Sequence, residues 1–206
     1  MKITILVEGQ TERAFKQHLN TFLRERLARN MPKLDFFPID GRIPKRQELQ
    51  RVVRRLLNRG RPPSDAVIAL TDVYTGTNPP DFETAADAKQ KMKQWAGNEK
   101  RFHPHVALHD FEAWLLPYWS KIQQRAGSNR TAPGRNPEMV NHGNPPAKRL
   151  AEVYRTGKKS RSYSKTIEAG AILQGEDLLV AINACPELKA FVNTILLLCD
   201  SSQVIP

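Results

Sequence analysis

The sequence is poor in cysteine and contains no long apolar run. Its two cysteines, Cys185 and Cys199, have neither CxxC spacing nor a disulfide-dense context, which excludes a disulfide-stapled secreted scaffold. No stretch approaches the ~20 apolar residues that a membrane span needs. The first apolar run, residues 2–7, meets a carboxylate at Glu8, which argues against a signal peptide. We therefore expect a reduced, cytoplasmic protein.

Glycine-rich phosphate loops are also missing. Neither GxxxxGKS/T nor GxGxxG occurs, so the sequence shows no sign of a P-loop ATPase or a dinucleotide-binding enzyme. Aromatic residues make up only 7% of the chain, although 40% of it is hydrophobic. That apolar content suffices for the core of one domain of 206 residues, with room for a small appendage.

Acidic residues are scarce compared with basic ones. Lysine and arginine total 32 against 21 aspartates and glutamates, which gives a formal net charge of +11. Residues 121–165 hold eleven basic side chains and two acids, and residues 42–61 hold eight and one. Unopposed like charges repel, so the first cluster predicts a polyanionic partner such as nucleic acid. In the second cluster a solvated helix face is an equal alternative.

Apolar patterning predicts strands that alternate with helices. Buried strands are expected at 2–7, 34–39, 66–71 and 102–108. Helices are expected between them, and a helical segment from about 146 to the C-terminus. This order is typical of an α/β fold: a mostly parallel, Rossmann-like sheet with helices on both faces and a C-terminal helical appendage. We expect a sheet domain at 1–119, a basic, partly flexible loop at 120–145, and a C-terminal helical extension at 146–206 packed on the sheet domain.

Acidic side chains follow three of the four predicted strands. Glu8 follows the first, Asp72 the third, and Asp110 and Glu112 the fourth. Ligands of open α/β sheets bind beyond the carboxyl ends of the strands, and carboxylates that converge there suit Mg²⁺. Three of these acids also have a structural alternative: Glu8 lies near a helix N-terminus, and Asp72 and Asp110 can cap a turn or a helix.

Six short segments carry a resemblance to a known family. In their order and spacing they resemble the motifs of a prokaryotic TOPRIM-like domain-of-unknown-function family, related to the TOPRIM domains of nucleases of the overcoming-lysogenization-defect (OLD) type. The resemblance implies a TOPRIM-like α/β fold and phosphodiester chemistry that depends on Mg²⁺ or Mn²⁺. It also implies an ATPase partner and a setting in phage defence. The segments are Val7–Glu12, Ala69–Tyr74, Leu108–Leu116, Pro145–Leu150, Tyr163–Lys165 and Ala184–Pro186.

The resemblance assigns roles to particular residues. Glu8 matches the glutamate after the first strand, and Asp72 matches the first aspartate of a DxD motif whose second aspartate is Tyr74 here. That replacement removes one metal ligand, for which Glu112 or Asp110 can compensate. The expected catalytic residues are Glu8, Asp72, Glu112 and Lys165; the expected metal ligands are Glu8, Asp72, Asp110 and Glu112; Glu12, Tyr74 and His109 are expected just outside the ligands.

Basic residues in the C-terminal half are expected to neutralise phosphate charge. The expected nucleic-acid-binding residues are Lys148, Arg149, Arg155, Lys158, Lys159 and Arg161. Together with the acids they predict a metal-dependent phosphodiesterase or nuclease that acts on DNA or RNA. The alternative is a non-catalytic module that binds nucleic acid or regulates a partner through a degenerate TOPRIM site, which Tyr74 would mark.

Overall fold

Four parallel strands form the sheet at the centre of the molecule. The computed structural model describes residues 1–9, 11–73, 81–134, 136–140, 145–159 and 162–206, without the side chains of 11–13. The strand order is β2-β1-β3-β4, and every neighbouring pair is parallel. The strands are β1 (Lys2–Val7), β2 (Lys33–Pro38), β3 (Ala66–Asp72) and β4 (Phe102–Ala107). The predicted α/β class and parallel sheet are therefore confirmed.

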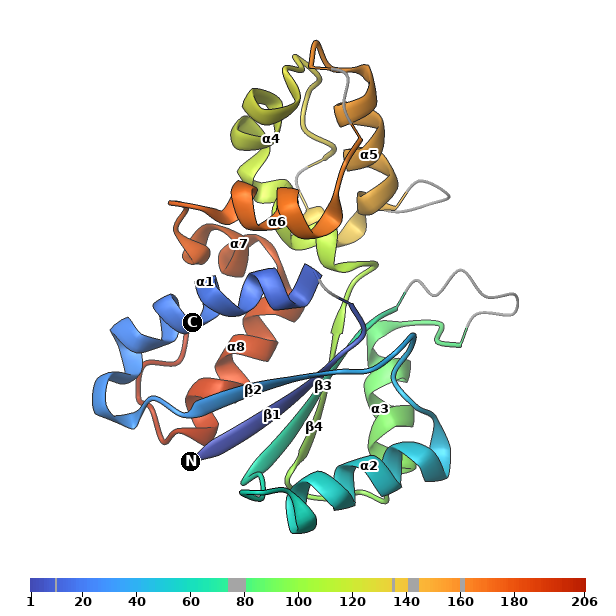
Figure 1. The fold of residues 1–206 in the computed structure, drawn as a ribbon, viewed down its shortest axis with the longest axis vertical. Helices are drawn as coiled ribbons and strands as arrows, with labels where there is room; N and C mark the ends of the chain where they lie inside the picture. Colours follow the sequence, from blue (N-terminus) through green and yellow to red (C-terminus); the bar gives the residue numbers. More distant parts are fainter. Residues whose placement is uncertain (10, 74–80, 135, 141–144, 160–161) are drawn as a thin grey trace.

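Helices cover both faces of this sheet (Figure 1). Side chains alternate along each strand, so Ile5 of β1 faces the core shared with α1 and α8, whereas Leu6 faces the core shared with α2 and α3. The α-helices are α1 (Thr11–Leu27), α2 (Arg46–Arg59), α3 (Ala85–Trp95), α4 (Trp119–Ala126), α5 (Pro146–Thr156), α6 (Lys165–Leu173), α7 (Leu178–Ala184) and α8 (Pro186–Leu198), and the 3-10 helices are η1 (Ala28–Asn30), η2 (Phe111–Tyr118) and η3 (Pro137–Met139).

The segment expected as a loop at 120–145 begins with a helix. Helix α4 forms because Ile122 and Ala126, four residues apart, are both buried, and Gly127 ends it in the left-handed conformation at φ 65°. The composition of the segment hides this helix, because glycines and prolines further along dominate it. The prediction of a loop was therefore wrong for residues 120–126.

Helices α4, α5 and α6 form a group above the sheet (Figure 1). The buried carboxylate of Glu168 on α6 accepts hydrogen bonds from Arg125 Nε on α4, at 2.6 Å, and from the Tyr154 hydroxyl on α5, at 2.7 Å. Each of the three helices thus supplies one member of a buried polar cluster. A buried carboxylate is costly unless it is paired, so this cluster determines how the three helices meet.

The C-terminal helices are continuous with the sheet core. Phe191, Val192 and Ile195 of α8 belong to the same buried cluster as Ile5 of β1. Glu138, which is buried, accepts hydrogen bonds from Trp114 Nε1 at 3.1 Å and from the backbone N–H of Glu187 at the start of α8. Among the described residues, no single helix is long and apolar enough to span a membrane; only the sharply bent pair α7 and α8 meets the length and composition criteria together.

Candidate functional site

Glu8 directly follows β1 and joins two other segments at the sheet edge. Its Oε1 accepts hydrogen bonds from the backbone N–H of Ile43, at 2.8 Å, and from the hydroxyl of Thr71. Its Oε2 accepts the backbone N–H of Asp72 at 3.3 Å. β1 pairs with β3 in parallel register, so the ends of these two strands bring Glu8 and Asp72 together. Burial raises the pKa of Glu8, and these hydrogen bonds, together with the charge of Arg42, oppose the increase only in part.

A second pair of acids follows β4. Asp110 is 6% exposed and Glu112 is 1% exposed, and both belong to the turn that opens η2. Asp110 occupies the cap position of η2, but its side chain does not cap that helix; Oδ2 instead accepts the backbone N–H of Ala147, in the first turn of α5, at 3.1 Å. The helix dipole favours a negative charge at that point. Burial and the neighbouring Glu112 carboxylate nevertheless raise the pKa of Asp110.

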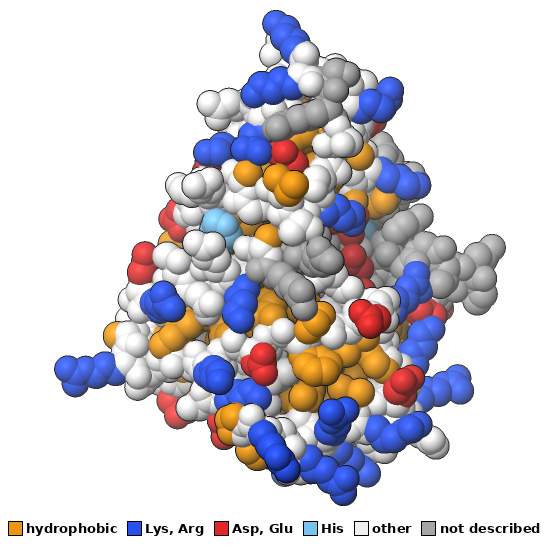
Figure 2. All heavy atoms as spheres, viewed as in Figure 1, with side chains coloured by type: hydrophobic (Ala, Val, Ile, Leu, Met, Phe, Trp, Pro, Cys, Tyr) orange, Lys and Arg blue, Asp and Glu red, His pale blue; other side chains and the backbone are white. Residues whose placement is uncertain are grey.

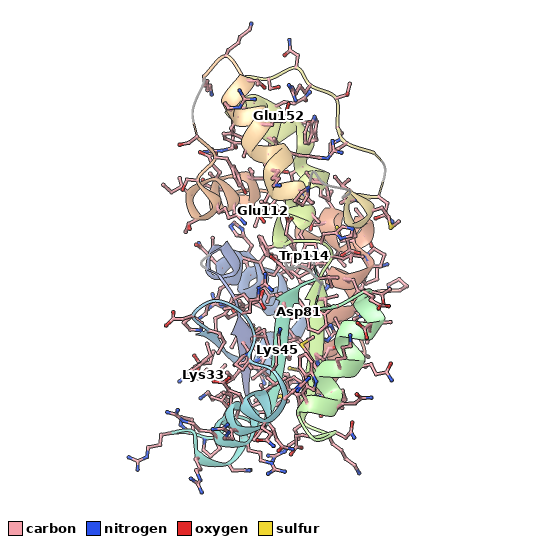
Figure 3. The ribbon with its side chains drawn as sticks, turned by 90° about the vertical axis from the view of Figure 1, so that its right-hand side faces the viewer. Lys33, Lys45, Asp81, Glu112, Trp114 and Glu152 are labelled. Carbon is pink, nitrogen blue, oxygen red and sulfur yellow. The ribbon has the colours of Figure 1, made fainter. Side chains whose placement is uncertain are left out.

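Lys165 provides a cation beside these acids. It starts α6, and its Nζ lies 3.2 Å from Oε1 of Glu112, although its side chain is 54% exposed. Partial burial lowers the pKa of the ammonium group, but Glu112, Asp110 and Asp72 outweigh burial and raise it. Figure 3 shows Glu112 at the level where the α4–α5–α6 group meets the sheet. Lys165 therefore links the upper helices to the acids that follow β3 and β4.

Two groups in the site were not predicted from the sequence. Tyr163 lies next to Lys165 in the chain, and burial and the charge of Glu112 raise the pKa of its phenol, so the hydroxyl stays protonated. Asp81 binds both Arg42, at 3.1 Å, and Lys45, at 2.5 Å, and Lys45 above all lowers its pKa (Figure 3). Tyr163 stood in one of the six recognised segments, whereas no sequence signal distinguished Asp81.

The predicted nucleic-acid-binding residues separate into two places. Lys148 and Arg149 lie in the first turn of α5, beside the backbone that binds Asp110. Arg155 lies in the last turn of that helix and Lys158 just beyond it, both exposed, and Lys159 donates from Nζ to the carbonyl of Gln124 at 3.1 Å. Seven residues of helix separate Lys148 from Arg155, which is about 10 Å. Among the described members of this set, only Lys148 and Arg149 therefore adjoin the carboxylates.

His109 lies half-buried between β4 and Asp110. Three other expected residues cannot be placed. Tyr74 and Arg161 lie outside the described residues, and the side chain of Glu12 is not described.

The donor chemistry of this edge suits a hard cation, but the ligands are not gathered into one cluster. Oδ1 of Asp110 is buried and accepts no hydrogen bond from the described residues, and carboxylate oxygens are the ligands that Mg²⁺ prefers. In the ranges that the structure describes, however, no three His, Cys, Asp or Glu side chains are close enough to hold one ion. Both oxygens of Glu8 are also occupied by hydrogen bonds. The other carboxylates at this edge are those of Asp72, Asp110 and Glu112.

The fold and site define an all-parallel α/β domain with acids at the carboxyl edge of its sheet. A family model described as "Domain of unknown function (DUF4276)" matches residues 7–196, and the chain belongs to that family. A search of the curated proteins finds no match. The expected resemblance to a domain-of-unknown-function family related to OLD proteins is thereby confirmed.

Solved structures of OLD proteins have a similar fold. One is the C-terminal region of the Burkholderia pseudomallei OLD protein, with 15% identity and a TM-score of 0.50 over 92% of this chain and 98% of that one. Another is the C-terminal region of the Xanthomonas campestris pv. campestris OLD protein, with 15% identity and a TM-score of 0.46 over 95% of this chain and 94% of that one. At 15% identity, the similarity to the Burkholderia pseudomallei structure establishes the fold alone.

Proposed function

We propose that this protein is a metal-dependent phosphodiesterase that cleaves nucleic acid. The observation that carries the proposal is the arrangement at the carboxyl edge of the sheet. Glu8 contacts the backbone of Asp72, while Asp110 and Glu112 share the same edge with the Lys165 ammonium. Phosphodiester cleavage needs oxygen ligands for a divalent ion and a cation for the phosphate, and this edge supplies both kinds of group.

Each residue at this edge would have its own role in cleavage. Two of the three carboxylates of Asp72, Asp110 and Glu112 would hold Mg²⁺ or Mn²⁺, because such an ion needs only one or two carboxylates besides water and phosphate oxygens. When bound, the ion polarises a phosphoryl oxygen and lowers the pKa of water. Glu8 fixes the backbone of Asp72 and so orients that side chain. Lys165, whose ammonium remains protonated, would neutralise charge on the scissile phosphate. Lys148 and Arg149 would hold the next phosphates, because the start of α5 is bound to Asp110.

The resemblance to OLD-type proteins also suggests the biological process in which the protein would act. In that setting the domain would act on DNA or RNA in phage defence, together with an ATPase partner.

One observation favours a non-catalytic alternative. The cation beside Glu112 is the protein's own Lys165, and in the described part of the chain no three-residue metal cluster forms. Tyr74 stands where the second acid of a DxD motif is expected. A module that binds nucleic acid or regulates a partner would need charge at this edge but no metal.

Cleavage assays separate the two functions. Plasmid DNA, single-stranded DNA and RNA are incubated with the purified protein in Mg²⁺, Mn²⁺ or EDTA. We expect metal-dependent products that are lost in Asp72→Asn and Glu112→Gln. The matched control is Glu25→Gln, an acid on α1 remote from these residues. Cleavage that persists in both site variants refutes the proposed site. Binding without cleavage in any metal supports the alternative.

A further inference from the structure

Helix α2 carries a row of arginines that the proposed site does not use. Its buried side, Leu49, Val53 and Leu57, packs towards the sheet at intervals of four residues. Arg51, Arg55 and Arg59 repeat at the same interval, displaced by two residues and hence by about 200° around the helix. All three are exposed, so the row points away from the core. Figure 2 shows basic side chains gathered over the lower part of the molecule, where Figure 1 places α2.

Among the described residues, these arginines lack the acidic partners that other cations have. Lys2, Lys89, Lys91, Lys121 and Arg130 each pair with an acid. Within the described ranges, no ion pair or side-chain hydrogen bond involves six arginines of the α2 region. The six are Arg46, Arg51, Arg54, Arg55, Arg59 and Arg61.

Nearby acids do not neutralise the row. Glu99 pairs with Arg101, and Asp65 accepts the backbone N–H of Lys2 at 2.6 Å. Glu48, in the first turn of α2, is the only acid within residues 42–61. Like charges at four-residue spacing on one helix repel by a few tenths of a kcal/mol per pair, so the row is unfavourable until an anion binds.

The row begins next to the candidate site. The loop that leads into α2 donates the Ile43 backbone N–H to Glu8, and Arg42 and Lys45 of the same loop hold Asp81. From there α2 extends away from the carboxyl edge of the sheet, because it follows β2 and must return to the start of the parallel strand β3. An extended polyanion that reaches the carboxylates can therefore continue along α2.

The chemistry of the row fits phosphates. Seven of the eight basic residues at 42–61 are arginines, whose planar guanidinium binds phosphate through two parallel hydrogen bonds. Successive members of the row are about 6 Å apart along the helix axis, and the row spans about 12 Å. A DNA duplex carries one charge per ~1.7 Å, so a segment of this length presents several phosphates.

We infer that Arg51, Arg55 and Arg59 of α2 form a second nucleic-acid-binding surface, which holds the backbone of DNA or RNA on the side of the carboxylates opposite to α5. The inference rests on the proposed function only in taking nucleic acid as the partner. Binding through this row requires no metal and no cleavage.

Salt-dependent binding tests the row directly. Fluorescence anisotropy in EDTA measures the affinity for a labelled DNA duplex, a DNA single strand and an RNA single strand across a salt series. In Arg51→Gln/Arg55→Gln we expect the slope of log affinity against log salt to fall by about 2, since each lost phosphate contact removes about 1. Arg51→Lys/Arg55→Lys, which retains both charges, is expected to keep the slope.

The matched control removes the same charge elsewhere. Arg24 and Arg29 are exposed cations at the end of α1 and in η1, on the side of the sheet opposite to α2, and Arg24→Gln/Arg29→Gln should leave the slope unchanged. If the slope decreased equally in both double variants, binding would depend on the total charge of the protein and not on the α2 row. That result would overturn the inference. An unchanged slope in the α2 variant, or no binding by the wild type, would also overturn it.

The outcomes separate this surface from the proposed enzyme. If the salt slope decreases in the α2 variant while the wild type cleaves nothing, the α2 surface is supported and the nuclease proposal is refuted. If the α2 variant binds like the wild type while Glu112→Gln abolishes cleavage, the nuclease stands and the surface is refuted. Melting curves followed by circular dichroism check that each variant folds, which we expect because the substituted side chains are exposed.

Discussion

Nζ of Lys165 lies 3.2 Å from Oε1 of Glu112, so an exposed lysine at the start of α6 neutralises a carboxylate that is only 1% exposed. The contact joins the sheet edge to the α4–α5–α6 group. Breaking a buried pair on one side leaves an uncompensated charge, which is costly, although solvent around the lysine reduces the cost.

Removal of this lysine should therefore destabilise the fold through Glu112. We expect Lys165→Met to lower the free energy of unfolding by about 1 kcal/mol, a value reduced for solvent screening. The double variant Lys165→Met/Glu112→Gln should lose less than the sum of the two single variants, because the buried charge is gone. Urea unfolding of all four proteins measures this coupling, and strictly additive losses would show that the pair does not interact.

Asp110 should make stability depend on pH. Burial and Glu112 raise the pKa of Asp110 above its ordinary value of 3.8, so the folded chain holds this proton more tightly than the unfolded chain. The resulting cost is absent below the ordinary pKa and grows as the pH rises through the folded pKa. Asp110→Asn should thus be more stable than wild type at pH 8, by on the order of 1 kcal/mol.

That difference should vanish at about pH 3, below the ordinary pKa of 3.8, where both states of the wild type hold the proton. Asparagine keeps an oxygen that accepts the Ala147 N–H, so the hydrogen bond survives the substitution. Thermal melts in EDTA across this pH range provide the measurement. A variant less stable than wild type at pH 8 would contradict the stated cause.

A divalent ion should stabilise the folded protein whether or not cleavage occurs. Binding at a concentration 100 times the dissociation constant adds about 2.7 kcal/mol. In a chain of this size each kcal/mol raises the melting temperature by about 2–4 °C. We expect Mn²⁺ to raise the melting temperature of the wild type and of Glu25→Gln, but not of Asp72→Asn. An equal increase of the melting temperature in all three proteins would show that the ion binds at another site.

The polar cluster of Glu168 should hold the three upper helices together. Tyr154→Phe removes one hydrogen bond to the buried carboxylate, and we expect it to cost about 1 kcal/mol. Glu168→Gln leaves Arg125 without its charged partner, so a larger loss of about 2–3 kcal/mol is expected. Chemical unfolding measures both losses. Thr156→Ala, which changes an exposed residue at the end of α5, serves as the control.

The strands and their direction could be predicted because their signal is local. Residues 3–7 and 66–71 are buried throughout and mostly apolar, as strands covered on both faces must be, and the helices between them require parallel pairing. The acids after the strands were likewise visible in the sequence. Helix α4 was missed because its two buried positions, Ile122 and Ala126, are too few to stand out from the polar residues around them.

The sequence by itself determined an α/β domain with acids at the carboxyl ends of its strands and with two strongly basic segments. Only the tertiary structure decided which charges meet. It placed Lys165 against Glu112, bound Asp110 to the start of α5, and left the arginines of α2 without acidic partners in the described chain. Apolar periodicity records which face of an element is buried, whereas an ion pair depends on how distant elements are placed, which no local pattern contains.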